Sequence, residues 1–353
     1  MTDRTGYPRG LRLLLTAAAL VIVFWGVHQA QEFLVFFLVA AFFAMLGTPP
    51  VLWLERKRVP SAIAVLLVVA GMATLLLVVG ASVGASINGF YSEAPAYQAR
   101  FEEQASTIQS FLLHQGIRGM DKVLRGYLNP GAVLSMTATL LSGLGSALSN
   151  IVLILLTIAF ILLEASSFPI KLRAVLGDPW QVFPEFTRFV GDLERYVVIK
   201  TLVSLATGLL VGTGLALLGV DFPVIWGFLA FLLNYVPNVG STLAAVPAVF
   251  LAFVQLGIVP ALAAAAGYMV INFVLDNLIE ARLMGRRLHL STLVVFLSLM
   301  FWGSLLGPVG MVLCIPLTMT VKFACENDPG TRWIAVLLGP EVPAAPVLPR
   351  PDR

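Results

Sequence analysis

Charged side chains are scarce in this sequence. Lysine, arginine, aspartate and glutamate make up 12% of its 353 residues, whereas hydrophobic residues make up 59%. A soluble globular domain typically carries about 25% charged residues, so this chain has too few to cover a folded surface in water. The mean hydropathy of +0.92 indicates a protein whose apolar side chains face lipid, and the lipid bilayer is its first expected partner.

The residues and motifs of common catalytic and metal sites are also rare. The chain has two cysteines and three histidines, and no pair of histidines has a metal-ligand spacing. The sequence contains no glycine-rich phosphate loop with lysine, no nucleophile elbow and no metalloprotease motif. A net charge of +3 gives no nucleic-acid signature. We therefore expect no enzyme activity, cofactor, metal ion or nucleic-acid partner, and an ATP-driven pump is disfavoured.

Long apolar runs are abundant, and each membrane-spanning helix needs about 20 such residues. The expected fold is an all-α, polytopic integral membrane protein with about six to eight membrane helices. We expect six regions in chain order: three membrane helices in 1–87, a small helical extramembrane insert in 88–140, a fourth membrane helix in 141–165, an amphipathic cytoplasmic linker in 166–200, a C-terminal membrane bundle in 201–325, and a disordered, proline-rich tail in 336–353.

Two of the apolar runs are interrupted near their middle. Proline and glycine break the hydrogen-bond ladder of a helix, and so free backbone groups for other partners. Each run could be a single kinked helix or a helical hairpin that enters and leaves the membrane through one face. The interrupting residues are Asn234, Pro237, Asn238 and Gly240 in the run 224–254, and Gly303, Gly307 and Gly310 in the run 293–321.

Clusters of basic residues predict the orientation of the chain. One cluster, 56–58, follows the second span, and another, at Arg282, Arg286 and Arg287, precedes the second interrupted run. The positive-inside rule places both clusters in the cytoplasm. That placement requires an even number of crossings between them, which results if the run 224–254 is a hairpin. We therefore predict two hairpin-like segments that enter from opposite faces, with both chain termini in the cytoplasm.

Three stretches of the sequence carry a family resemblance. They are the run 234–240, the run 276–285 followed by 288–291, and the closing pattern with Gly303, 307–310 and 316–317. In this order they resemble the signatures of the autoinducer-2 exporter family, from the first span to about residue 322. The resemblance implies a transporter of the bacterial cytoplasmic membrane, a homo-oligomer, driven by an ion gradient if active. Members of this family are linked to autoinducer-2 export, and others resemble sodium/proton antiporters, so the solute stays open.

The candidate site combines the interrupted runs with two carboxylates. Asp276 and Glu280 lie one turn apart on one helix face, and an ionisable group in the membrane usually faces a cavity or a partner. Lys200 or Arg286 could pair with them, although a solvated helix end is an alternative. Transporters place binding sites at broken helices, whereas kinking or close helix packing would explain the prolines and glycines without a site.

We predict that these candidate residues line a solute or ion pathway. The favoured function is secondary transport, with the two interrupted runs forming a site that gating exposes to alternate sides. A passive pore and a sodium/proton antiporter are alternatives within transport. A non-transporting membrane scaffold is the alternative from another class. The full set of candidate pathway residues is Asn234, Pro237, Asn238, Gly240, Asp276, Glu280, Gly303, Gly307 and Gly310.

Overall fold

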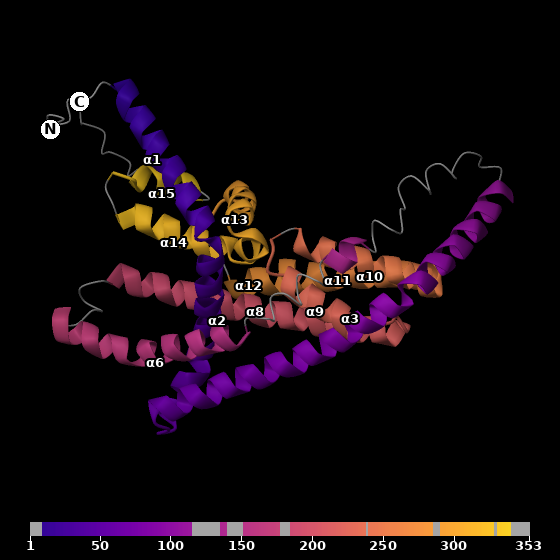
Figure 1. Cartoon of the computed structure of the whole chain (residues 1–353), viewed down its shortest axis with the longest axis horizontal. Helices are drawn as coiled ribbons and strands as arrows, with labels where there is room; N and C mark the ends of the chain where they lie inside the picture. Colours follow the sequence, from indigo (N-terminus) through magenta and orange to yellow (C-terminus); the bar gives the residue numbers. More distant parts are fainter. Residues whose placement is uncertain are drawn as a thin grey trace, which may run out of the picture. The chain divides into compact units, whose positions relative to one another are not determined.

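The computed structural model describes residues 9–114, 135–139, 151–176, 184–237, 239–284, 290–327 and 330–339, and every regular element in these ranges is a helix (Figure 1). By length and composition, five helices in this part of the chain could cross a membrane: Gln31–Arg56, Ser61–Glu93, Glu185–Leu218, Ile258–Met284 and Thr292–Val312. Shorter apolar helices are Ile151–Ala165, Pro223–Leu233 and Gly240–Leu256. The all-α, polytopic fold expected from the sequence is confirmed.

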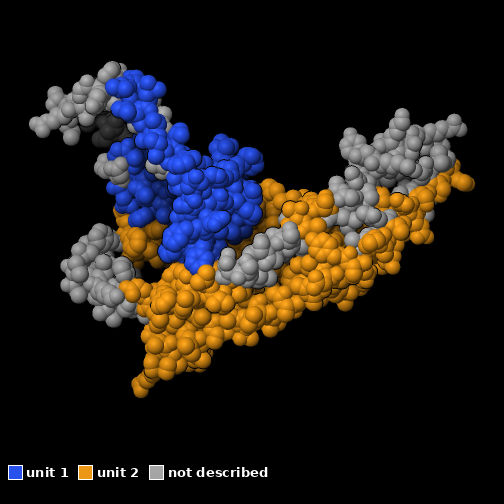
Figure 2. Space-filling view, viewed as in Figure 1, with its two compact units in different colours: residues 1–43, 290–353 blue, residues 44–289 orange. Residues whose placement is uncertain are grey.

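The chain divides into two compact units, residues 1–43 with 290–353 and residues 44–289 (Figure 2). Helix α2 (Gln31–Arg56) belongs to both. The first unit also contains α1 (Arg9–Gln29), α13 (Thr292–Val312), α14 (Cys314–Asn327) and α15 (Arg332–Leu338). The second contains α3 (Ser61–His114), α6 (Ile151–Leu176), α8 (Pro184–Leu218), α9 (Pro223–Leu233), α10 (Gly240–Leu256), α11 (Ile258–Asn272), the π-helix η1 (Phe273–Glu280) and α12 (Ala281–Met284).

Helix α3 is much longer than a membrane span. It continues without interruption over 54 residues (Figure 1), which corresponds to about 81 Å at 1.5 Å per residue. The hydrocarbon core of a bilayer is only about 30 Å thick. The third predicted span and the start of the predicted insert at residue 88 are therefore parts of one helix. Most of the remaining insert lies outside the described residues.

The first interrupted run is a helical hairpin made of α9 and α10. At its tip, the backbone N–H of Gly240 donates to the carbonyl oxygen of Val236 at 3.2 Å. At its base, the backbone N–H of Asp221, just before α9, donates to Oε1 of Gln255 near the end of α10, at 3.0 Å. Because the two helices meet at both ends, they lie side by side and antiparallel. The hairpin alternative is thus confirmed over a single kinked span.

Small residues let the hairpin pack closely inside its unit. Lipid gives no hydrophobic drive for two helices to associate, so close backbone approach supplies the attraction. A Cβ atom on Gly208 of α8 would lie 2.6 Å from the carbonyl oxygen of Gly227 on α9. On α10, Ala244, Ala248 and Ala252 are fully buried at successive turns. The hairpin forms the centre of the second unit's core, which α3, α8 and α11 complete.

A polar cluster holds the base of this hairpin against α3. Tyr97 of α3 donates a hydrogen bond to Oδ2 of Asp221 at 3.1 Å, and the side-chain amide of Gln255 donates to both groups. Trp226 Nε1 donates to the backbone oxygen of Asp221 at 2.9 Å. Burial and the nearby charges of Asp221 and Glu93 raise the pKa of Tyr97, so its hydroxyl stays protonated and remains a donor.

The second interrupted run is also a hairpin, which turns at Gly307. The backbone of Gly307 has φ 66° and ψ −151°, a region that only glycine adopts without strain. Beyond the turn the chain runs back along itself. Trp302 Nε1 donates to Oγ1 of Thr318 at 3.0 Å, and Thr318 donates to Oγ of Ser298 at 2.8 Å. The sequence prediction of two hairpin-like segments is confirmed for both runs.

Candidate functional site

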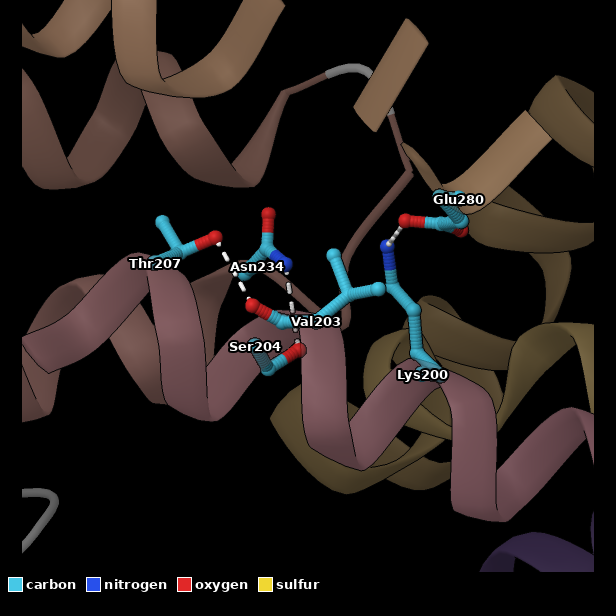
Figure 3. Close-up of polar contacts among 6 residues, drawn as sticks. All are labelled: Lys200, Val203, Ser204, Thr207, Asn234 and Glu280. Carbon is cyan, nitrogen blue, oxygen red and sulfur yellow. Dashed lines mark hydrogen bonds and ion pairs between the residues drawn. The ribbon is translucent and has the colours of Figure 1, made fainter. Parts of the chain in front are cut away.

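The tip of the first hairpin carries buried polar side chains that contact α8. Asn234 and Tyr235 follow the last turn of α9, and both are buried. The side-chain amide of Asn234 donates to Oγ of Ser204 at 3.1 Å (Figure 3). The hydroxyl of Tyr235 donates to Oγ1 of Thr201 at 2.7 Å. These two bonds fix the broken end of the hairpin to one stretch of α8.

Helix α8 meets the tip with a polar face in its second, mostly apolar half. Lys200, Ser204 and Thr207 recur at four- and three-residue steps, so they share one face, and all three are buried (Figure 3). Burying polar groups is costly unless they are hydrogen-bonded. The hydroxyl of Thr207 satisfies this condition locally by donating to the carbonyl oxygen of Val203 at 3.0 Å. Lys200 and Ser204 instead bind side chains of other elements.

A buried ion pair stands next to the tip. Lys200 Nζ lies 2.8 Å from Oε2 of Glu280, and the two side chains are only 8% and 16% exposed (Figure 3). Asp276 interacts with the charges of Lys200 and Glu280 and with the side chain of Asn234. Its Oδ1 is buried, and no protein group in the described ranges donates a hydrogen bond to it. Of the two cations suggested by the sequence, Lys200 is the partner, and Arg286 lies outside the described residues.

The carboxylates are carried by an unusual helix. Residues 273–280 form the π-helix η1, which continues α11 directly. π-Helices are rare, and single π turns occur frequently at functional sites. In η1, Glu280 binds Lys200 on the polar face of α8, and the charge of Lys200 also acts on Asp276. We refer to Lys200, Ser204, Asn234, Asp276 and Glu280 as the tip cluster; it joins α8, the hairpin and η1.

Comparison with known proteins identifies the kind of protein in which this cluster lies. The sequence model for AI-2E family transporters matches residues 14–328. The chain belongs to the AI-2E family. This transporter is 41% identical over 331 residues to the AI-2 transport protein TqsA of Escherichia coli strain K12, a match covering 93% of this chain and 96% of TqsA. The autoinducer-2 exporter resemblance seen in the sequence is confirmed.

Two further relatives show how widely the match extends. The putative transport protein YhhT of Escherichia coli strain K12 is 36% identical over 334 residues, which cover 95% of this transporter and 96% of YhhT. A putative transport protein of Haemophilus influenzae is 34% identical over 334 residues, which cover 93% of this transporter and 96% of its own length. The protein is therefore a multi-pass membrane transporter, in agreement with its apolar helices.

The AI-2E transporter brings some of the predicted site residues together within its second unit. Asn234, Asp276 and Glu280 meet in the tip cluster. Pro237 and Gly240 belong to the same hairpin tip, where a Cβ atom on Gly240 would lie 1.7 Å from the carbonyl oxygen of Leu233. Gly240 is therefore required for tip packing. Asn238, also predicted as a pathway residue, lies outside the described residues.

The three glycines of the second run belong to the transporter's other unit. Gly307 provides the turn of the second hairpin. A Cβ atom on Gly303 would lie 2.8 Å from Cγ of Met311, and one on Gly310 would lie 2.0 Å from the carbonyl oxygen of Trp302. These contacts match the helix-packing alternative. In the described part of the chain, no three His, Cys, Asp or Glu side chains are grouped closely enough to hold a metal ion.

Some polar side chains at the hairpin tip and on the facing part of α8 were not predicted from the sequence. Thr201, Ser204 and Tyr235 were not recognised as site residues, although Lys200, Ser204 and Thr207 already show helical spacing in an apolar segment. A search for polar residues on one face of each apolar run would have found Ser204, but not Thr201 or Tyr235. The residue pattern of 273–280 does not predict a π-helix.

Proposed function

We propose that this AI-2E transporter is a secondary transporter that exports a small polar solute, and that the tip cluster is its binding site. The observation that carries the proposal is the buried Lys200–Glu280 pair, with Asp276 beside it, at the broken tip of a hairpin. Charged groups at membrane depth are costly and mark substrate or ion paths. Secondary transporters bind their substrates where helices are discontinuous. Transport rather than catalysis is the activity that we infer for the cluster.

The solute that the comparisons favour is a signalling molecule of the autoinducer-2 type. TqsA is named an AI-2 transport protein, and this chain is 41% identical to it over nearly its whole length. The tip cluster offers an ammonium, two carboxylates, an amide and a hydroxyl within a small volume of protein. Such a set suits a small solute that carries several hydrogen-bonding groups. Autoinducer-2 is thus the first solute to assay.

A sodium/proton antiporter is the second candidate function. It is favoured by the two carboxylates, Asp276 and Glu280, which interact with a single lysine. The experiment that separates the candidates is a flux assay with the purified protein in liposomes, with and without sodium and proton gradients. A secondary exporter moves solute faster with a gradient, an antiporter moves ions without solute, a passive pore ignores gradients, and a scaffold moves nothing.

Replacing Asp276 with asparagine tests whether the tip cluster lies on the transport path. The change removes one charge and keeps the size of the side chain. We expect solute flux in liposomes to fall roughly tenfold or more, equivalent to about 1.4 kcal/mol, while the protein still inserts into the membrane. Glu102→Gln, an exposed carboxylate on α3, is the matched control and should transport normally. If Asp276→Asn transported solute at the wild-type rate at every pH, Asp276 would not belong to the transport path.

We place the transporter in the bacterial cytoplasmic membrane, with both termini in the cytoplasm. The support is the basic cluster 56–58 and the positive-inside rule. In a background with Cys314→Ala and Cys325→Ala, an impermeant thiol reagent should label Glu102→Cys and not Arg56→Cys in whole cells; both positions are exposed in the structure. The opposite labelling pattern would invert the orientation. The family resemblance also supports a homo-oligomer, which cross-linking in native membranes would detect.

A further inference from the structure

The tip cluster has one positive charge too few for its carboxylates. The charged groups that act on Asp276 are Lys200 of α8 and Glu280 of η1, and the hairpin contributes the neutral Asn234. Among the described residues of these elements, the other cations are exposed: Arg188 and Arg195 of α8, and Arg282 of α12. Arg195 donates to the backbone oxygen of Leu283. In this part of the chain, one ammonium therefore serves two carboxylates.

Two side-chain oxygen atoms at the junction of α11 and η1 accept no hydrogen bond from the described protein groups. Oδ1 of Asp276 and Oδ1 of Asn272, which lies one turn earlier, are both buried without a hydrogen-bond partner in the described residues. Both atoms are acceptors when Asp276 is ionised. Hard cations prefer oxygen ligands, and a proton on the carboxyl group would neutralise the same charge. The free acceptors thus lie where the missing positive charge is needed.

We infer that Asp276 and Asn272 bind one mobile positive charge, a sodium ion or a proton, and that Lys200 is a tethered competitor for this charge. The inference rests on the proposed transport function, because it assigns the coupling ion to the proposed site. With the ion on Asp276, Lys200 stays on Glu280 and the cluster is neutral. When the ion leaves, Lys200 is shared by both carboxylates and the cluster carries one net negative charge.

The chemistry of lysine suits this exchange. Its ammonium is a compact charge with three donors on a flexible four-carbon stem, so it can move between two carboxylates. The ion-free state is costly in a membrane because one negative charge remains uncompensated. Because Asn234 of the hairpin tip interacts with Asp276, the tip contacts the group whose charge the ion changes. This link is what a secondary transporter needs to use an ion gradient.

The test measures ion binding without measuring transport. The thermal midpoint of the purified transporter is followed during a sodium titration, with choline chloride keeping the ionic strength constant, and in sodium-free buffer across a pH series. A ligand that binds the folded state raises the midpoint in a concentration-dependent way. A saturable sodium effect identifies sodium, and a pH effect without any sodium effect identifies the proton. Asp276→Asn should remove the effect, and Asn272→Ala should weaken it.

Variants of the ion pair give the decisive signature. Lys200→Met removes the competitor, so the apparent affinity for the ion should rise roughly tenfold. In Glu280→Gln, Asp276 is the remaining carboxylate partner of Lys200, so Lys200 competes more strongly with the ion. The apparent affinity for the ion should therefore fall by a similar factor. A purely structural lysine would lower stability in both variants without opposite shifts in affinity. If Lys200→Met cannot be purified, the fall in Glu280→Gln carries the test alone.

The outcomes separate this inference from the proposed function. Equal responses of the wild type and Asp276→Asn to sodium and to pH would overturn the ion site, even if the liposomes transport solute. Shifts in the same direction for the two ion-pair variants would overturn the role of Lys200. An ion-dependent midpoint in a protein that moves no solute would leave the ion site standing and refute solute export.

Discussion

Gly240→Ala is expected to abolish transport and to lower the stability of the folded protein by about 3 kcal/mol, the upper range for overpacking a tight core. The added Cβ atom would lie 1.7 Å from the carbonyl oxygen of Leu233. That oxygen belongs to the backbone, so no side-chain rotation relieves the contact. The tip of the first hairpin must open, which separates Asn234 and Tyr235 from their partners on α8. Denaturant midpoints in micelles and liposome flux measure the two effects.

The matched control for this substitution is Gly267→Ala on α11. A Cβ atom there meets no atom within 4 Å, and alanine favours a helix over glycine by about 1 kcal/mol. This variant should be as stable as the wild type or slightly more stable, with unchanged flux. If Gly240→Ala were as stable and as active as Gly267→Ala, Gly240 would not be packed closely against the backbone of Leu233.

Lys200→Met is expected to destabilise the protein by about 3 kcal/mol, because it leaves Glu280 as an uncompensated buried charge. The double variant Lys200→Met/Glu280→Met removes both charges and fills similar volume. Replacing a whole buried pair with apolar groups is often neutral or stabilising, so the double variant should regain most of the stability. It should not regain transport. Unfolding free energies of the four proteins in a double-mutant cycle, together with flux, provide the measurement.

The control cycle uses a more exposed pair on α14. Lys322 and Glu326 lie 3.6 Å apart at an i, i+4 spacing, and their side chains are 13% and 50% exposed. Ion pairs at this helical spacing contribute roughly 0.3–0.5 kcal/mol when they are exposed, and the exposed carboxylate of Glu326 can be solvated without Lys322. The coupling free energy in the Lys322→Met/Glu326→Met cycle should therefore be small, and transport should persist. An equally small coupling energy for Lys200 and Glu280 would mean that their pair is solvated.

Much of the fold follows from the sequence because its causes are local or cumulative. Scarce charge and long apolar runs require a membrane, and proline and glycine placed inside two runs predict a break in each. The basic clusters then favour a hairpin over a single crossing, since charge placement depends only on the number of crossings. Even the pairing of a cation with Asp276 and Glu280 could be anticipated, because a buried carboxylate needs a partner.

The rest of the site depends on contacts between segments far apart in the chain. Lys200 and Arg286 were equal candidates, and only the packing of η1 on α8 decides for Lys200. Tyr235 and Thr201 meet because α9 runs antiparallel to α8, which no pattern around either residue reveals. The glycines of the second hairpin could be read as site or as packing residues; Met311 and the carbonyl oxygen of Trp302 show that neighbouring atoms fill the space beside Gly303 and Gly310.

Because α3 is long, a small change in its tilt produces a large displacement where it contacts the first hairpin. From Ser61 to Tyr97 the helix spans about 54 Å at 1.5 Å per residue, and Tyr97 is hydrogen-bonded to Asp221 and Gln255 at the hairpin base. A tilt of about 5° over that length displaces one end by about 5 Å, more than a hydrogen bond can stretch. The hairpin base must therefore follow α3 or release Tyr97. A displacement of α3 at Tyr97 therefore acts first on the base of the hairpin, the end opposite to the tip that carries Asn234.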